Sequence, residues 1–504
     1  MPRDNAIFVA RSLPDDGYTR LNDRLYRAQG ALLIVFPLLL VVQAVLFRSS
    51  FYVIAVHALC FAIAAGVVRM IGPRDAALAF IIIHPFWFFS FALYFYAFAH
   101  GKSAETDLYA PLLSASLELV ALSASLVGYG LVGGLSRLGG LPAARPALTT
   151  PLLRRFAISL MVFAAPFSFV ALFDPANHFF NAVTGLANPL VYLSVICLCV
   201  ANGANWYRAP LLWAIVGGQF VFSVLVNSRG TYLAIGLTIA VVYLAQELRL
   251  ITFGRLIAGY IAVRAMNSLS YVMLAGRLEV GHEGSVPLVV QALASPDFYF
   301  AVLGFDTLRD TQSLVDSDVM RHDLYQLDMF EGHRGLAERL TELPFMDIIV
   351  AYLPRKLPID WHEIANCFLS IMPSFGQTKD PDLFDDRLAW QTGVMVNNTV
   401  GHPLITAIGE FYAMGGTVVL FVLFCLNMAL IYYFYFLTRR MFGDRYIATA
   451  TLTVSSIYLV FSSTAASALS VPLRIYPVIV LSYIVFARVA KVIGGSPGAL
   501  TQRA

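Results

Sequence analysis

The stretch "QGALLIVFPLLLVVQAVLF", residues 29–47, decides the fold class of this chain. It contains no charged side chain, and a helix of about 20 apolar residues is long enough to cross the hydrocarbon core of a bilayer. Similar stretches recur along the 504 residues, of which 59% are hydrophobic and 13% charged, whereas a soluble globular protein carries about 25% charged residues. The sequence therefore predicts an all-α, polytopic integral membrane protein.

Twelve segments of this kind are predicted to span the membrane. They comprise residues 29–47, 51–68, 76–98, 108–133, 156–173, 187–204, 209–226, 231–246, 251–270, 408–437, 446–466 and 472–490. The ninth is the weakest of them, because it contains Arg255 and Arg264.

The placement of arginine and lysine supports this number, because these residues collect near the cytoplasmic ends of spans. With the N-terminus in the cytoplasm, the inside segments carry most of the cations. The short outside loops carry four, namely Arg48, Lys102, Arg229 and Arg474. Without the ninth span, Arg439 and Arg440 would lie outside. We therefore expect both termini in the cytoplasm.

One long segment between spans nine and ten has a different composition. Residues 271–400 hold 19 of the 31 acidic residues and 9 of the 34 basic residues. A connection of this length is too long to be passive, and the stretches 286–294 and 337–353 have amphipathic helical patterns. We expect a partly helical periplasmic cap. The predicted divisions are a cytoplasmic segment 1–28, spans one to nine in 29–270, the cap 271–402, spans ten to twelve in 403–490 and a cytoplasmic tail 491–504.

A permanent cation lies at the outer boundary between spans seven and eight, in "VLVNSRGTYLAIGL", residues 224–237. The guanidinium of Arg229 offers five donors in a rigid fork that suits bidentate phosphate binding. The helix that opens at Gly230 would add free backbone N–H groups to an anion site. Alternatively, Arg229 reaches up to lipid phosphates or pairs with an acid of the cap.

A carboxylate lies where the cap leads into the tenth span, in "TVGHPLITAIGEFYAMGGTVVLF", residues 399–421. Glu410 follows His402 by eight residues, a spacing that places both on one helix face. Pro403 favours a helix start, so His402 is alternatively a capping residue, and Glu410 alternatively a local cap or ion-pair partner. Gly409, Gly415 and Gly416 permit close approach of another helix.

A third polar stretch, "YLPRKLPIDWHEIANC", covers residues 352–367 of the cap. Arg355 follows an amphipathic helix, which places its charge near the membrane surface, and Trp361 follows six residues later. The sequence contains no glycine-rich phosphate loop, no Cys/His cluster with metal-ligand spacing and no patterned nucleic-acid face, so we expect no metal, no cofactor and no nucleic-acid partner.

These elements together resemble the bacterial O-antigen and exopolysaccharide repeat-unit polymerases. Such proteins have ten to fourteen spans with a large periplasmic loop in the second half. The resemblance is carried by Ser228-Arg229-Gly230 at a span start, by Leu353-Pro354-Arg355 with Pro358 in the loop, and by Gly409-Glu410-Phe411-Tyr412 with Gly415 and Gly416. The chain has "AMGG" where the family usually has Asn-Phe-Gly. The related O-antigen ligases place a His about nine residues before the glutamate and a Gly two residues after it, spacings that this chain lacks.

The resemblance implies a metal-independent glycosyltransferase of the bacterial inner membrane. Its donor would be a glycan on undecaprenyl pyrophosphate and its acceptor a sugar hydroxyl of a second lipid-linked repeat unit. Arg229, Glu410 and His402 would act in catalysis, with Glu410 or His402 as the base. Arg355, Ser228, Gly230, Tyr412 and Trp361 would bind substrate. A chain-length regulator and a flippase of the same pathway would be its partners.

Two other classes are compatible with a chain of many spans. A polysaccharide flippase or other secondary transporter would use twelve spans, although transporters usually show two related halves and interrupted helices at the membrane midplane. A membrane scaffold without catalytic activity would need none of the polar residues above for glycan chemistry.

Overall fold

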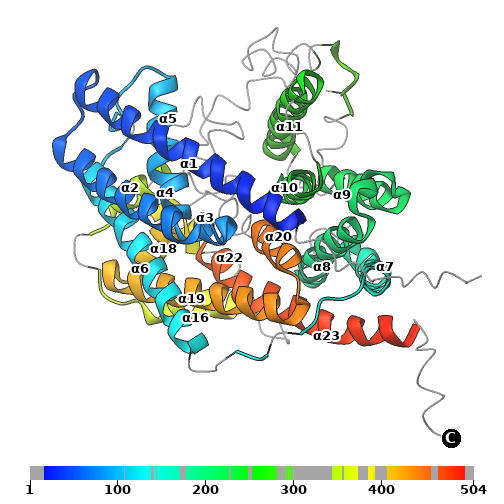
Figure 1. Cartoon of the computed structure of the whole chain (residues 1–504). Helices are drawn as coiled ribbons and strands as arrows, with labels where there is room; N and C mark the ends of the chain where they lie inside the picture. Colours follow the sequence, from blue (N-terminus) through cyan, green and yellow to red (C-terminus); the bar gives the residue numbers. More distant parts are fainter. Residues whose placement is uncertain are drawn as a thin grey trace, which may run out of the picture.

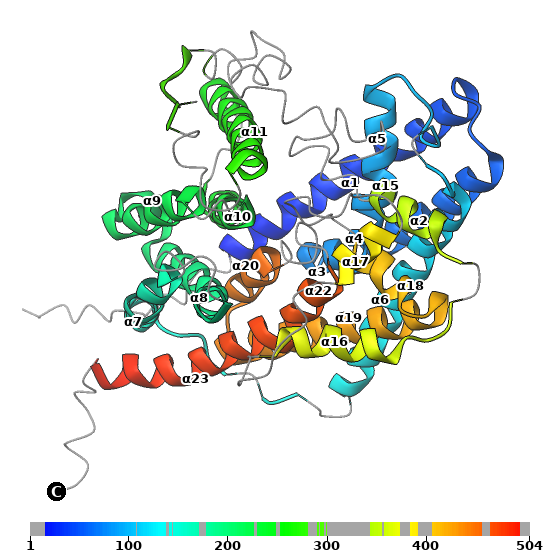
Figure 2. The ribbon, with the colours of Figure 1, turned by 180° about the vertical axis from the view of Figure 1, so that it is seen from behind.

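A computed structural model describes residues 16–106, 108–137, 141–143, 145–170, 178–225, 229–247, 252–280, 290–291, 293–296, 299, 343–354, 357–372, 384–391, 406–455 and 464–493. Every regular element in these ranges is a helix, as Figures 1 and 2 show. The all-α fold class is therefore confirmed for the described part of the chain.

Seven of the described helices are long and apolar enough to cross a membrane. They are α1 (Asp16–Val45), α2 (Phe51–Ile71), α6 (Pro111–Arg137), α7 (Thr150–Ser168), α8 (His178–Asn202), α19 (Gly416–Phe442) and a last helix formed by α22 (Ala465–Ser470), η8 (Val471–Ile475) and α23 (Tyr476–Ile493). Many of their large apolar side chains lie on the protein surface, for example Ile34, Phe51 and Val162. A surface of this kind is stable against lipid, which agrees with the predicted membrane protein.

An eighth span is broken. α3 (Ala76–Ile82) meets the helix made of α4 (His84–Phe86), η1 (Trp87–Phe91) and α5 (Ala92–Ala99) at an angle of 69°. Pro85 is the second residue after the break at Ile83, and a proline ring removes one backbone donor and clashes with the preceding helical turn. η1 is a single π-helical turn, a feature that often occurs at functional sites.

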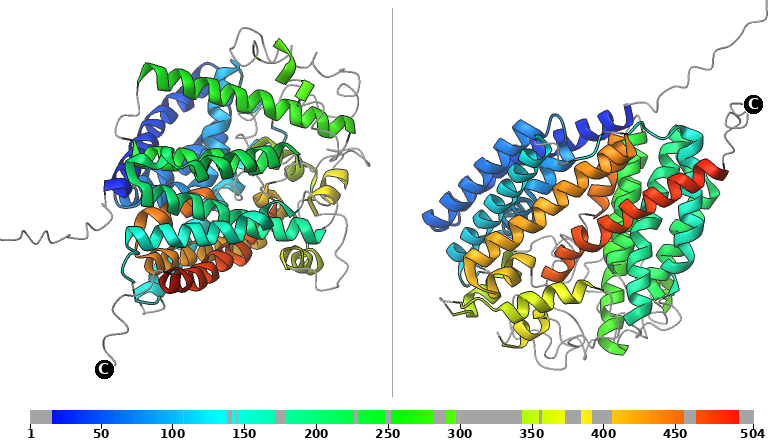
Figure 3. Two further views of the ribbon diagram at one scale, coloured as in Figure 1. Left: turned by 90° about the vertical axis from the view of Figure 1, so that its right-hand side faces the viewer. Right: turned by 90° about the horizontal axis from the view of Figure 1, so that it is seen from below.

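Four further predicted spans coincide with helices that are shorter, or whose apolar part is shorter, than a full crossing. They are α9 (Pro210–Leu225), α10 (Arg229–Gln246), α11 (Phe253–Val280) and α20 (Arg445–Ser455). The second part of the eleventh predicted span, residues 456–463, lies outside the described residues. The number of twelve spans therefore stays a prediction. Figure 3 shows α11 at the margin of the bundle.

The central helices α6 and α19 run parallel and define two ends of the bundle. Their starts both lie near α15 (Leu343–Tyr352), which contacts the first residues of α6 and the helix α18 (Ala407–Ala413) that precedes α19. At their other ends, Arg440 Nη1 of α19 donates to the carbonyl oxygens of Leu141 and Pro142, which follow α6. Midway, the hydroxyl oxygens of Ser125 and Tyr432 are 2.6 Å apart, and a Cβ at Gly128 would lie 2.8 Å from the carbonyl oxygen of Cys425. We call the end where both helices begin the cap end, and the end where both finish the basic end. The basic end carries a cluster of arginines: Arg69, Arg74, Arg439, Arg440 and Arg445.

Residues 271–280 of the predicted cap continue α11, and the part described from residue 343 onward is helical and lies at the cap end. It comprises α15 (Leu343–Tyr352), α16 (Trp361–Ile371) and α17 (Phe384–Gln391), shown in yellow and yellow-green in Figure 2. α15 falls within the predicted helical stretch 337–353, whereas most of 286–294 lies outside the described residues. α16 and α17 are joined by an ion pair in which Arg387 Nη2 lies 2.6 Å from Glu363 Oε2.

A buried carboxylate attaches the cap to the bundle. Asp347 of α15 is fully buried and accepts hydrogen bonds from the backbone N–H groups of Tyr109 and Ala110 and from the Ser114 hydroxyl at the start of α6. Burial raises the pKa of the Asp347 carboxyl, whereas these three donors act in the opposite direction. The carboxylate satisfies the N–H groups of the two residues that lead into α6 and adds negative charge at the start of that helix.

Replacing Asp347 with alanine should release α15 from α6. The variant leaves buried donors without an acceptor, which costs about 1–3 kcal/mol, so we expect a lower unfolding temperature in detergent and faster proteolysis within residues 343–391. Asp23→Ala, which removes an exposed aspartate from α1, is the control. Equal proteolysis of the cap in both variants would show that Asp347 does not attach it.

Candidate functional site

The segment that carries Glu410 is a short helix followed by a sharp turn. α18 (Ala407–Ala413) begins at Thr406, whose hydroxyl accepts a hydrogen bond of 3.2 Å from the Gly409 N–H. The chain then turns into α19 through Gly415 and Gly416, and Gly416 has a φ of +75° that favours glycine. A Cβ at Gly415 would lie 3.1 Å from the Cα of Ile359. The two glycines of "AMGG" thus form the turn and let the cap approach it.

Glu410 lies at a junction of three helices near the cap end. Its side chain is buried, and its Oε2 accepts a hydrogen bond of 3.0 Å from the backbone N–H of Ala465, the first residue of α22. α16 packs on the other side, where burial, together with the carboxylates of Glu410 and Glu363, raises the pKa of the Cys367 thiol. A carboxylate at a helix N-terminus is electrostatically favoured, so Glu410 stabilises the start of the last membrane helix, which begins at Ala465, seven residues before the predicted span 472–490.

The structure places the other predicted site residues as follows. Arg229 and Gly230 are the first two residues of α10, so a helix begins where the sequence predicts one. The structure does not describe the Arg229 side chain. Trp361 begins α16 and is 71% exposed, whereas Tyr412 of α18 is buried. Ser228, Arg355 and His402 lie outside the described residues.

The geometry adds one cation that the sequence analysis noted only as an outer-loop residue. Arg474 lies in η8, a π-helical turn within the last membrane helix, and is half-buried. It follows Ala465 by nine residues, which is about 13 Å along a helix axis. A Cβ at Gly185 of α8 would lie 3.4 Å from Arg474 Nη2. The stretch "VPLRIYPV" could have indicated it, because an arginine inside an apolar run is a functional candidate by default.

A second polar cluster lies inside the bundle and was missed by the sequence analysis. His57 of α2, Ser90 of η1 and Glu118 of α6 are all fully buried. His57 Nδ1 is 2.6 Å from Ser90 Oγ, which in turn is 2.6 Å from Glu118 Oε1. His57 and Glu118 follow the cap-end starts of their helices by six and seven residues, or about 10 Å. The signal was available, because both are ionisable residues within predicted spans.

This cluster forms a chain of hydrogen bonds with a defined direction. The Ser90 hydroxyl donates to Glu118 and accepts from His57 Nδ1–H, so the second ring nitrogen, Nε2, carries no proton in the neutral imidazole. Nε2 is buried and has no hydrogen-bond partner within the described residues.

The buried cluster does not suit nucleophilic catalysis by serine. In such catalysis the histidine takes the serine proton, whereas here the Ser90 hydroxyl donates to the carboxylate of Glu118. Among the described residues, no group of three His, Cys, Asp or Glu side chains could hold a metal ion. Metal independence stays a prediction from the sequence.

Comparison of the chain with protein-family models, with curated proteins and with solved structures found no match.

Two substitutions of Glu410 test whether its hydrogen bond to Ala465 N–H stabilises the fold. Glu410→Gln keeps an oxygen that can accept from Ala465 N–H, so we expect an unfolding temperature close to that of the wild type. Glu410→Ala leaves this buried N–H without the carboxylate and should cost about 1–3 kcal/mol. Thermal unfolding in detergent measures both. A Glu410→Gln variant as unstable as Glu410→Ala would contradict the assigned hydrogen bond.

The buried cluster predicts a similar contrast at Glu118. Glu118→Gln retains an acceptor for Ser90, whereas Glu118→Ala leaves the hydroxyl without its acceptor and opens a cavity, at a cost of about 2–4 kcal/mol. Ser116→Ala, on the exposed side of the same helix, should change stability by less than about 0.5 kcal/mol. Equal unfolding temperatures for the two Glu118 variants would argue against the hydrogen-bonded chain.

Proposed function

We propose that this chain joins lipid-linked oligosaccharide repeat units into a polysaccharide at the periplasmic face of a bacterial inner membrane. The observation that carries the proposal is the position of Glu410. The carboxylate of the "GEFY" element is buried between the cap helix α16 and the membrane helices that begin with α18 and α22. Such a junction would allow a periplasmic glycan and its membrane-bound lipid to meet at one site.

The reaction requires a base and fixed positive charge. The acceptor sugar hydroxyl attacks the anomeric carbon of the donor glycan, a new C–O bond forms, and the bond from that carbon to the lipid pyrophosphate breaks. The hydroxyl proton passes to Glu410 or His402, and the bonding electron pair leaves with the pyrophosphate. Arg229, with Arg355, would stabilise the leaving pyrophosphate in a site of low dielectric constant. Arg474 is a further cation of the same outer part of the bundle.

The burial of Glu410 adds a condition to this mechanism. Its side chain is 2% exposed and is bonded to Ala465, so its carboxylate can reach an acceptor hydroxyl only when α16 or α22 moves away. If neither moves during turnover, Glu410 is a positioning residue for α22 and His402 acts as the base.

A lipid-linked glycan flippase is the second candidate, and one observation favours it. The span formed by α3, α4, η1 and α5 is bent by 69°, and the buried cluster of His57, Ser90 and Glu118 contacts its π-helical turn. Interrupted helices and buried ionisable residues are typical of transporters. An O-antigen ligase remains a relative of the first proposal, with less suitable spacings around Glu410.

The role of Arg229 can be tested in cells that lack this chain. Wild-type protein should restore long polysaccharide on a gel, whereas Arg229→Ala at matched expression should leave single repeat units, because the leaving pyrophosphate loses its bidentate partner. Arg48→Ala removes an exposed cation of a different predicted outer loop and should support normal chain lengths. Normal lengths with Arg229→Ala would remove this residue from the proposed site.

Reconstitution separates the two candidate functions. A polymerase should lengthen lipid-linked repeat units in proteoliposomes that contain only this chain. A flippase should move the units between leaflets and leave their length unchanged, an outcome that would overturn the polymerase proposal.

A further inference from the structure

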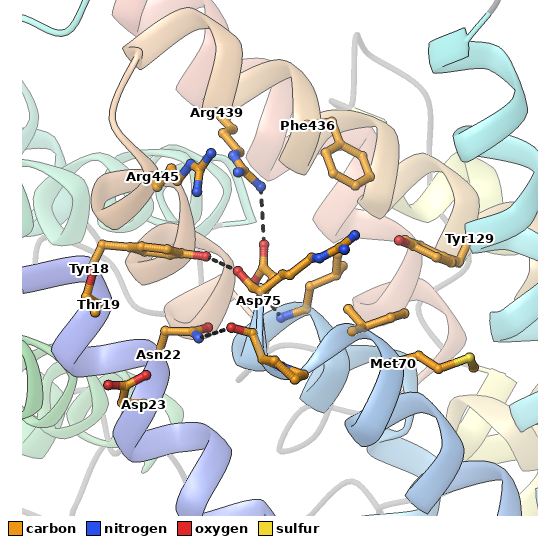
Figure 4. Close-up of a pocket in the computed structure, with 14 residues that line it drawn as sticks. Tyr18, Thr19, Asn22, Asp23, Met70, Asp75, Tyr129, Phe436, Arg439 and Arg445 are labelled. Atoms are coloured by element: carbon orange, nitrogen blue, oxygen red, sulfur yellow. Dashed lines mark hydrogen bonds and ion pairs between the residues drawn. The ribbon is translucent and has the colours of Figure 1, made fainter. Parts of the chain in front are cut away.

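A cavity of about 520 Å³ lies at the basic end of the bundle, opposite the cap end where Glu410 lies. It is formed by the start of α1, the turn between α2 and α3, the last turns of α6 and α19, and the start of α20, as Figure 4 shows. Its charged lining residues are Asp23, Arg74, Asp75, Arg439 and Arg445.

One side of the cavity is held in place by a network of hydrogen bonds. Asp75 is buried, caps α3 by accepting from Leu78 N–H, and accepts from the Tyr435 hydroxyl at 2.5 Å. Asn22 of α1 accepts from Ala76 N–H at 2.6 Å, and its amide donates to a carbonyl of the same turn. The turn between α2 and α3 is thereby fixed, so a ligand would meet a preorganised surface.

The cavity carries more positive than negative charge. Arg439 Nη1 lies 3.5 Å from Asp75 Oδ2, so one cation is paired. The side chains of Arg74 and Arg445 are exposed and form no hydrogen bond or ion pair with any described residue. The Arg445 guanidinium lies over the ring of Tyr18, 5.9 Å from its centre, and faces the same space as Arg439 in Figure 4. Cations held together in this way are stabilised by an anion.

Helix stability does not explain the position of Arg445. It is the first residue of α20, where the helix dipole disfavours a cation. The N–H groups of Tyr446 and Ile447 at this end already donate to the Asp444 carboxylate. Arg445 therefore contributes charge to the cavity at some cost to its own helix.

The opposite side of the cavity is apolar. Met70, Ile71, Leu78 and Phe436 line it, and Met70 is 71% exposed on the surface of α2. A charged side and an apolar side in one cavity match a molecule that carries an anionic group on a hydrocarbon chain.

We propose that this cavity binds a phosphate oxyanion, with Arg74 and Arg445 as its principal ligands and Arg439 beside them. Guanidinium groups bind phosphate oxygens through paired hydrogen bonds, and their charge does not depend on pH in the working range. The phosphate belongs to a membrane lipid headgroup or to a soluble phosphate ester, and the apolar side favours the lipid.

Native mass spectrometry of the full chain in detergent tests the site. The probes are phosphatidylglycerol, phosphatidylcholine as a zwitterionic control, and glycerol 3-phosphate as a soluble competitor. The variant is Arg74→Gln with Arg445→Gln. The control is Arg27→Gln with Arg69→Gln, because these exposed arginines lie toward the same end and do not line the cavity.

The wild type should bind phosphatidylglycerol at least tenfold more tightly than phosphatidylcholine. The Arg74/Arg445 variant should lose about tenfold in affinity, and the control should stay within twofold of the wild type. Displacement by millimolar glycerol 3-phosphate would assign the ligand to soluble esters, whereas retention of the lipid would assign it to headgroups. Equal losses in variant and control, or no loss in either, would overturn the proposal.

An unfolding temperature for each protein excludes a folding defect as the cause of lost binding. If the double variant unfolds below the wild type, Arg445→Gln alone replaces it. This exchange removes a cation from a helix N-terminus, so we expect it to leave the unfolding temperature unchanged or raised while the affinity falls at least threefold. Unchanged affinity in a folded Arg445→Gln protein would also overturn the proposal.

Discussion

Backbone N–H and C=O groups inside a bilayer find no water, so each must be hydrogen-bonded within the protein. The constraint is most severe at helix starts, because the first N–H groups of a helix have no hydrogen-bond partner within that helix. Three buried carboxylates meet the requirement here. Asp75 caps α3, Asp347 accepts from the residues at the start of α6, and Glu410 accepts from the first residue of α22.

The same three carboxylates join segments that are distant in the sequence. Asp75 accepts from Tyr435 of α19, Asp347 connects the cap to α6, and Glu410 connects α18 to α22. Each contact therefore both completes a helix and fixes how two parts of the fold meet. For Glu410 this structural role exists whether or not the residue takes part in catalysis. Glu410→Gln keeps an oxygen for the Ala465 N–H and is therefore more informative about catalysis than Glu410→Ala, which removes the acceptor.

The polar features divide between the two ends of the bundle. Glu410 and the helices of the cap lie at one end, and the arginine-lined cavity lies at the other. Between them, nearer the cap end, are the buried cluster of His57, Ser90 and Glu118 and the bent span beside it. The parallel course of α6 and α19 connects these regions, with Gly128 allowing close backbone contact between the two helices.

The sequence by itself determined the helical membrane fold, the positions of most described helices, α15 among them, and the concentration of arginine at one end. These properties follow from hydrophobicity, length and charge, which act over a few turns of chain. Only the tertiary structure decided the pairing of Glu410 with Ala465, of Asp347 with α6, and of Asp75 with Tyr435 and Arg439. It also decided the 69° bend and the meeting of His57 with Glu118. Such contacts depend on which helix faces pack together, and a local apolar pattern does not specify the neighbour of a helix in a bundle that lipid surrounds.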